Sequence, residues 1–173
     1  MTTTLTHALA PTVIEDGDIL FFRGTSRISK LIQFMTSSPY SHVGIAFSVT
    51  IGGVKRTLVI EAQGGTSRRI ISLDFYNNTE FHVVKSPVPF ESYSFIALQQ
   101  VGIQSYSYWD AFVVGLRERL RKTFGIYIIP QGNAKGEICS EFVARMLNVN
   151  PSSLSPQGLF AQISKPIEYI IKD

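Results

Sequence analysis

The sequence predicts an α+β fold in one domain, and three observations support this. The chain has 173 residues, of which 45% are hydrophobic and 17% charged, so it can bury one sizeable core. β-Prone segments dominate residues 19–85, and segments with helical periodicity dominate from Phe90 onward. No Pro-rich linker, low-complexity tract or internal repeat divides the chain. We therefore expect a single domain over residues 1–173, in which residues 1–15 form a flexible tail.

A buried strand and a short helix are expected first. The turn residues Gly17 and Asp18 precede the apolar run Ile19–Phe22, which predicts the strand. Ser26 can cap the helix, whose apolar residues repeat at helical spacing until Ser37.

A hairpin and two further strands are expected next. The β-prone stretches His42–Val49 and Thr57–Gln63 flank Gly52-Gly53, which is a good hairpin signal. Two more strand-like segments would complete a small antiparallel sheet or barrel, and these are Arg69–Phe75 and Phe81–Lys85.

Helices are expected to dominate the rest of the chain and to pack against this sheet. Helical periodicity covers Phe90–Gln104 and Tyr108–Lys122. A third helix is expected over Ser140–Leu147, directly after Cys139. One more short helix and a terminal strand are expected after Pro151.

Composition restricts the possible functions. The net charge of +3 is mild, and nothing resembles a nucleic-acid-binding motif. The basic run at 117–122 predicts a solvated helix face. The more specific alternative is that this run docks on an anionic membrane. One cysteine excludes an internal disulfide framework and, with three histidines, disfavours structural zinc. No cofactor or metal is expected. Without a signal-peptide pattern or an apolar run of roughly 20 residues, a cytoplasmic location is expected, as it would be for a viral or injected protein.

The expected hairpin brings candidate catalytic residues together. If it closes at the two glycines, the numbers of paired residues sum to about 105. His42 then faces Gln63, and Gly44 faces Glu61, so all four project from one face of the sheet. The Glu61 carboxylate is then within reach of the His42 ring. The small residues beside His42 would let a helix approach this face closely.

Cys139 is the expected partner of His42. At the N-terminus of a helix, unpaired backbone N–H groups and the helix dipole favour a thiolate over a thiol. A nearby imidazole would stabilise it further, and Glu61 would orient the imidazole ring. Gln63 is a rival for that orienting role. The alternative interpretation is that Cys139 is a small buried hydrophobic residue and His42 an ordinary polar one.

Four segments occur in an order that resembles a known family. They are GDILFF, SPYSHVGIAF, LVIEAQGG and ICSEFVARML, and together they span about Gly17–Leu147. They resemble the permuted papain-like amidases, the YiiX- and YaeF-like relatives of NlpC-type peptidases. The resemblance implies a circularly permuted papain-like fold in which the histidine is His42, the polar residue Glu61 and the nucleophile Cys139.

The same resemblance implies a function. It points to a cysteine peptidase or amidase that cleaves an amide (peptide or isopeptide) or ester bond through an acyl-enzyme. Its substrate would be a peptide or a small acyl-containing molecule, which Tyr40 and Tyr108 could also contact. Two alternatives stay open: a lipid acyltransferase or phospholipase of the lecithin-retinol acyltransferase-like type, and a non-catalytic module that binds a peptide or acyl group.

Overall fold

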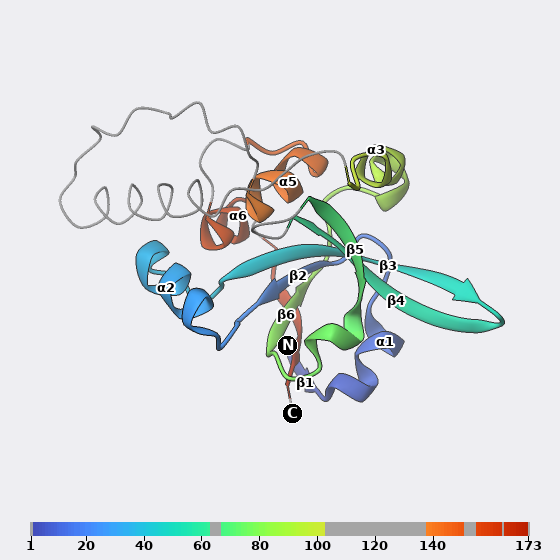
Figure 1. Cartoon of the computed structure of the whole chain (residues 1–173), viewed down its shortest axis with the longest axis horizontal. Helices are drawn as coiled ribbons and strands as arrows, with labels where there is room; N and C mark the ends of the chain where they lie inside the picture. The colour runs from blue at the N-terminus through green and yellow to red at the C-terminus, as the bar shows by residue number, and fades with distance from the viewer. Residues whose placement is uncertain (1, 63–66, 103–137, 151–154, 164, 173) are drawn as a thin grey trace.

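A mixed sheet organises the protein. The computed structural model describes residues 2–62, 67–102, 138–150, 155–163 and 165–172. Within them the strand order is β1-β7-β6-β2-β3-β4-β5, and all neighbours are antiparallel except β1 and β7, which run parallel (Figure 1). The strands are β1 Thr3–Leu5, β2 Ile19–Phe22, β3 His42–Ile51, β4 Val54–Ala62, β5 Arg68–Ser72, β6 Phe81–Val84 and β7 Ile167–Ile171.

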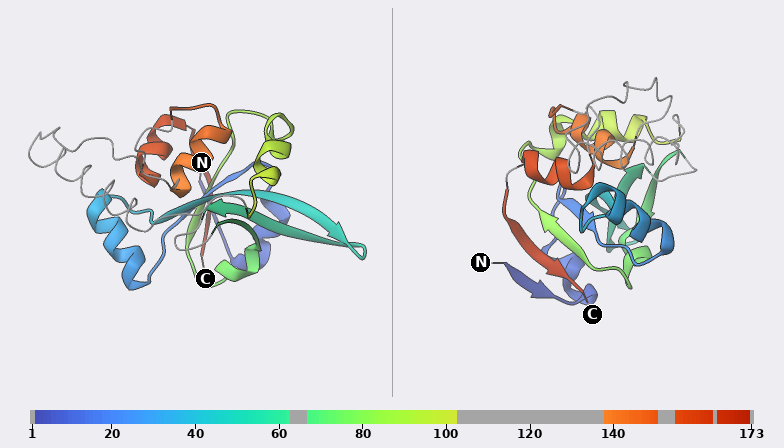
Figure 2. Two further views of the ribbon diagram at one scale, coloured as in Figure 1. Left: turned by 45° about the horizontal axis from the view of Figure 1, so that its top comes forward. Right: turned by 90° about the vertical axis from the view of Figure 1, so that its left-hand side faces the viewer.

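A sheet combined with helices confirms the expected α+β class. Because this sheet is open, the barrel alternative is wrong. The described strands leave β1 and β5 at opposite edges instead of pairing them. The edge strand β1 comes from the segment that we expected to be a flexible tail. That segment also contains a 3-10 turn, His7–Leu9, and helix α1, Ala10–Val13. Because β1 pairs with β7, the first and last strands of the chain lie side by side (Figure 2).

Helices cover both faces of the sheet. On one face lie α5 and α6, and α1 lies on the other (Figure 1). A 3-10 turn, η2, follows β5. The bounds of α5, α6 and the other helical elements are α2 Arg27–Thr36, η2 Leu73–Tyr76, η3 Phe90–Ser92, α3 Ser94–Gln99, α5 Cys139–Met146 and α6 Pro156–Ile163. Among the described helices, none combines the length and apolar character needed to cross a bilayer.

Two apolar clusters result from the alternation of side chains along the strands. Ile19 and Phe21 of β2 join the cluster beneath α5 and α6, whereas Leu20 and Phe22 join the cluster beneath α1 and η2. The buried strand that we expected at Ile19–Phe22 is confirmed, and it contributes to both clusters.

Several expected elements are confirmed by their local geometry. The Ser26 hydroxyl caps α2 by accepting a hydrogen bond from the Ser29 N–H at 3.1 Å. The β3–β4 register pairs Ile45 with Ile60 and Ile51 with Val54, as the diglycine turn predicted. Within residues 90–102, the described part of the helix expected over Phe90–Gln104, two shorter elements form instead, η3 and α3. The segment 108–122 lies outside the described residues.

Candidate active site

A fully buried carboxylate is the centre of the site. Glu61, near the end of β4, is 0% exposed. Its Oε2 accepts hydrogen bonds from His42 Nε2 at 2.9 Å and from the Tyr76 hydroxyl. Its Oε1 accepts one from Arg69 Nε at 2.8 Å. A buried charge is costly unless donors compensate it, and here both carboxylate oxygens have donors.

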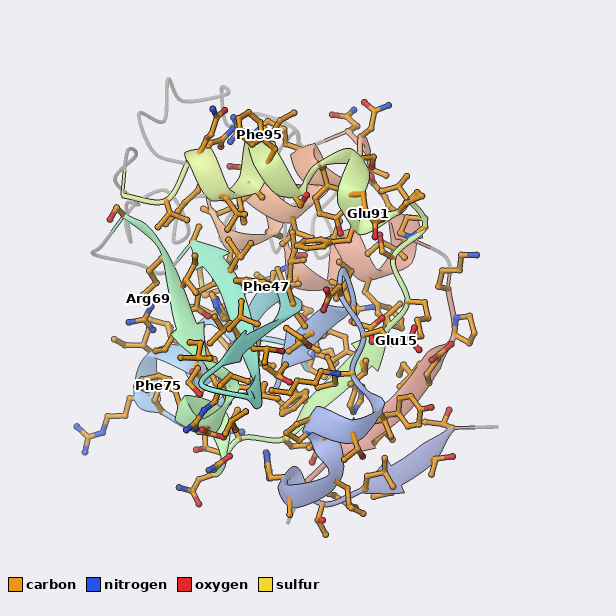
Figure 3. All side chains as sticks on the ribbon, turned by 90° about the vertical axis from the view of Figure 1, so that its right-hand side faces the viewer. Glu15, Phe47, Arg69, Phe75, Glu91 and Phe95 are labelled. Atoms are coloured by element: carbon orange, nitrogen blue, oxygen red, sulfur yellow. The ribbon has the colours of Figure 1, made fainter. Side chains whose placement is uncertain are left out.

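Strand pairing explains how Arg69 reaches Glu61. The two residues are opposite each other in the β4–β5 register. The Arg69 guanidinium also lies over the Phe75 ring, with its central carbon 5.3 Å from the ring centroid, and Figure 3 labels both residues at this edge of the sheet. Arg69 is therefore held between an aromatic face and the carboxylate.

The electrostatic surroundings favour an ionised His42–Glu61 pair. Burial alone would raise the pKa of Glu61, but His42, Tyr76 and Arg69 outweigh it and lower the pKa to about 2. Burial alone would lower the pKa of His42, but Glu61 and Cys139 outweigh it and raise the pKa to about 10. Burial and the neighbouring Glu61 charge raise the pKa of Tyr76, which keeps its hydroxyl proton on the donor.

His42 is the first residue of β3, and its side chain is 18% exposed. Its ring lies near Phe22, with centroids 5.7 Å apart, and is stacked with Tyr76 at 6.5 Å. Because Nε2 is hydrogen-bonded to Glu61, Nδ1 is the ring nitrogen that remains for a second partner. Cys139 is among the groups that raise the pKa of His42, so the thiol lies near the ring.

Cys139 is the first residue of α5, one position earlier than the helix start we expected, and it is 4% exposed. The preceding residue, Ile138, has an extended backbone, and its N–H donates to the Glu141 carboxylate at 3.2 Å. Cys139 therefore lies at a helix N-terminus, where backbone N–H groups lack partners within the helix.

The face that α5 covers differs from our expectation. We expected the helix against the small residues beside His42, but α5 packs on the opposite face, where its Phe142 and Val143 join Val43 and Ile45 in one cluster. A Cβ at Gly44 would lie 2.5 Å from Val59 Cγ1. Gly44 therefore makes room for a neighbouring strand and not for a helix. His42 is the first residue of β3 and Cys139 the first of α5, and the influence of Cys139 on the pKa of His42 indicates that these two positions lie near each other.

The secondary candidates have different outcomes. Gln63 and Tyr108 lie outside the described residues. Tyr40 is buried, and its hydroxyl is 2.8 Å from Nδ1 of His82, so the structure places this hydroxyl beside His82. Sequence reasoning did not identify Arg69 or Tyr76. The β4–β5 register could have indicated Arg69, whereas Tyr76 lies in a 3-10 turn without a periodic signal.

In the part of the chain that the structure describes, no three His, Cys, Asp or Glu side chains gather as a metal site would require. No model of a known protein family matches the chain, and no curated protein matches it. The fold is similar to that of the metalloprotein YiiX from Escherichia coli O157:H7, with a TM-score of 0.49 and 18% identity, covering 89% of this chain and 97% of that one. At this level of similarity, the likeness assigns neither a family nor an activity.

Proposed function

We propose that the chain is a cysteine hydrolase of the circularly permuted papain-like type, which cleaves an amide or ester bond through an acyl-enzyme on Cys139. One observation carries the proposal: the His42 ring is hydrogen-bonded to buried Glu61 at 2.9 Å, and Cys139, at the start of α5, is among the groups that raise the pKa of that ring. The strand with the histidine precedes the helix with the cysteine, which is the chain order of the permuted family that the sequence resembles.

The first half of the proposed reaction forms a thioester. Before the attack, the Cys139 proton resides on the His42 ring. The Cys139 thiolate then attacks the carbonyl carbon of the substrate, and the carbonyl oxygen gains the negative charge. The backbone N–H of Cys139 is a donor for that oxyanion. The intermediate then expels an amine or alcohol, to which His42 donates a proton as the C–N or C–O bond breaks.

The second half restores the enzyme. Water attacks the thioester while His42 accepts a proton from it, and the C–S bond breaks to release a carboxylic acid. The raised pKa of His42, about 10, supports its role as the acid in the first half, because the ring holds a proton near neutral pH.

Glu61 has a positioning role in this mechanism. Its hydrogen bond to Nε2 fixes the orientation and tautomer of the His42 ring and leaves Nδ1 available to Cys139. Arg69 and Tyr76 hold the carboxylate and so fix its orientation.

Thiol labelling tests the proposal, because the chain contains a single cysteine. An electrophilic, acyl-type activity probe should label wild-type protein and fail to label Cys139→Ala. The decisive comparison is His42→Ala, which retains the thiol but should react with the probe at least about 100-fold more slowly. This factor is the lower end of the rate loss typical when a general acid–base group is removed. If His42→Ala is labelled at the wild-type rate, Cys139 is an ordinary buried thiol and the hydrolase proposal fails.

A further inference from the structure

Helix α2 has an exposed face with an unusual combination of side chains. Three large apolar residues on it are exposed to solvent: Ile28 by 54%, Leu31 by 50% and Phe34 by 60%. Two bases, Arg27 and Lys30, are exposed on the same helix. At 100° per residue, all five side chains fall within an arc of roughly 160°. Such a face combines apolar contact area with positive charge.

The helix is anchored by its other side and its C-terminal end. Met35 and Thr36 are buried, and the Gln33 side chain donates to the Gly24 carbonyl oxygen at 3.0 Å. Figures 1 and 2 show α2 standing beside the sheet, in the connection from β2 to β3. Because β2 ends at Phe22 and β3 begins at His42, α2 lies at the end of the sheet that holds His42.

The surrounding sequence is strongly biased in charge. From Ile19 to Ile60 the chain contains no acidic residue, although it contains five basic ones: Arg23, Arg27, Lys30, Lys55 and Arg56. Arg23 pairs with Glu80 at 2.5 Å. The exposed face of α2 therefore carries two bases and no acid of its own.

We propose that α2 is a membrane-docking helix that binds the surface of an anionic bilayer. Large apolar side chains interleaved with Lys and Arg on one exposed helix face are the composition that binds the interface between headgroups and acyl chains. The bases complement the negative surface potential, and the apolar residues bury area that water now contacts. Docking through α2 would place the His42 end of the sheet at the lipid surface. This inference does not depend on the hydrolase proposal.

Vesicle sedimentation with the full-length protein tests the inference. Wild-type protein should bind phosphatidylcholine vesicles that contain phosphatidylserine, and more weakly those without it, with affinity falling as salt rises. The double variant Leu31→Gln/Phe34→Gln should bind about 100-fold more weakly or worse, from the apolar area lost. A second pair, Arg27→Gln/Lys30→Gln, should bind about 30-fold more weakly and lose most of the salt dependence.

A matched control comes from the tip of the β3–β4 hairpin, in the same acid-free stretch. Ile51 and Val54 are 66% and 53% exposed there, so Ile51→Gln/Val54→Gln removes comparable apolar area at a distant place. This variant should bind as wild type does. The inference is overturned if wild-type protein does not bind the vesicles, if both α2 variants bind as wild type does, or if the hairpin variant weakens binding as much as the α2 variants. Circular dichroism would verify that each variant is folded.

Discussion

Replacing Tyr76 with phenylalanine removes one hydroxyl from the donors that hold Glu61, and little else. The phenylalanine ring can keep the stacked contact with Phe22, whose centroid is 4.0 Å from that of Tyr76. A hydrogen bond to a charged group contributes about 1.5–3 kcal/mol to stability. Glu61 is fully buried, so water cannot replace the lost donor. We therefore expect Tyr76→Phe to lower the free energy of unfolding by about 2 kcal/mol at pH 7.

Urea-induced unfolding, followed by circular dichroism, measures this change, and Tyr93→Phe is the matched control. Tyr93 is also a buried tyrosine, but its hydroxyl donates to neutral Gly17 O at a long 3.4 Å. Loss of that weaker bond should cost about 1 kcal/mol or less. If Tyr93→Phe costs as much as Tyr76→Phe, the Tyr76 hydroxyl has no special role in holding the carboxylate.

The pH dependence of the Tyr76→Phe effect provides a second test. The pKa of Glu61 falls from its ordinary value of 4.5 to about 2 in the folded protein. A lowered pKa contributes stability that is present above the unfolded value and is lost as the pH falls through the folded value. The difference between wild type and Tyr76→Phe should therefore narrow from about pH 4.5 toward pH 2, whereas that for Tyr93→Phe should stay constant. A difference that is constant for both variants would refute this reasoning.

Further predictions concern the strand contacts and the ionised pair. Gly44→Ala should lower the free energy of unfolding in urea by about 1–3 kcal/mol, because the new methyl group would lie 2.5 Å from Val59 Cγ1. Glu61→Gln should lower kcat for amide or ester cleavage by up to about 10⁴-fold, since the amide would favour the wrong tautomer of His42; an unchanged kcat contradicts the triad. The raised pKa of His42 contributes stability that is present below its ordinary pKa of 6.5 and is lost as the pH rises through about 10. Stability of wild type should therefore decline over that range more than stability of His42→Gln, and parallel declines would contradict the pKa assignment.

Local rules predicted the proximity of His42 and Glu61 well. A two-residue turn fixes which residues pair along a hairpin, and side-chain alternation then fixes the faces. The observed pairing of Ile45 with Ile60 is the one that the turn at Gly52-Gly53 requires. These rules act over a few residues, so the sequence alone was sufficient to apply them.

Contacts between distant segments were harder to predict. Alternation separates the two faces of β3 but does not say which one a helix covers, and Gly44 was misleading because its small size serves the neighbouring Val59. The N-terminal segment lacks a periodic pattern, yet β1 forms because Thr3–Leu5 pairs with Tyr169–Ile171 at the far end of the chain. Tyr76 reaches Glu61 from a short 3-10 turn, for which no spacing rule exists.

A nuclear magnetic resonance titration of the histidine rings, in wild-type protein and in Cys139→Ala, tests the central claim most directly. Cys139 is one of the groups that raise the pKa of His42 to about 10. Removing the thiol should therefore lower the pKa of His42. The titration of His82, whose partners are Tyr40 and Glu80, should not move. A His42 pKa that is the same with and without the thiol would contradict the pairing of Cys139 with His42.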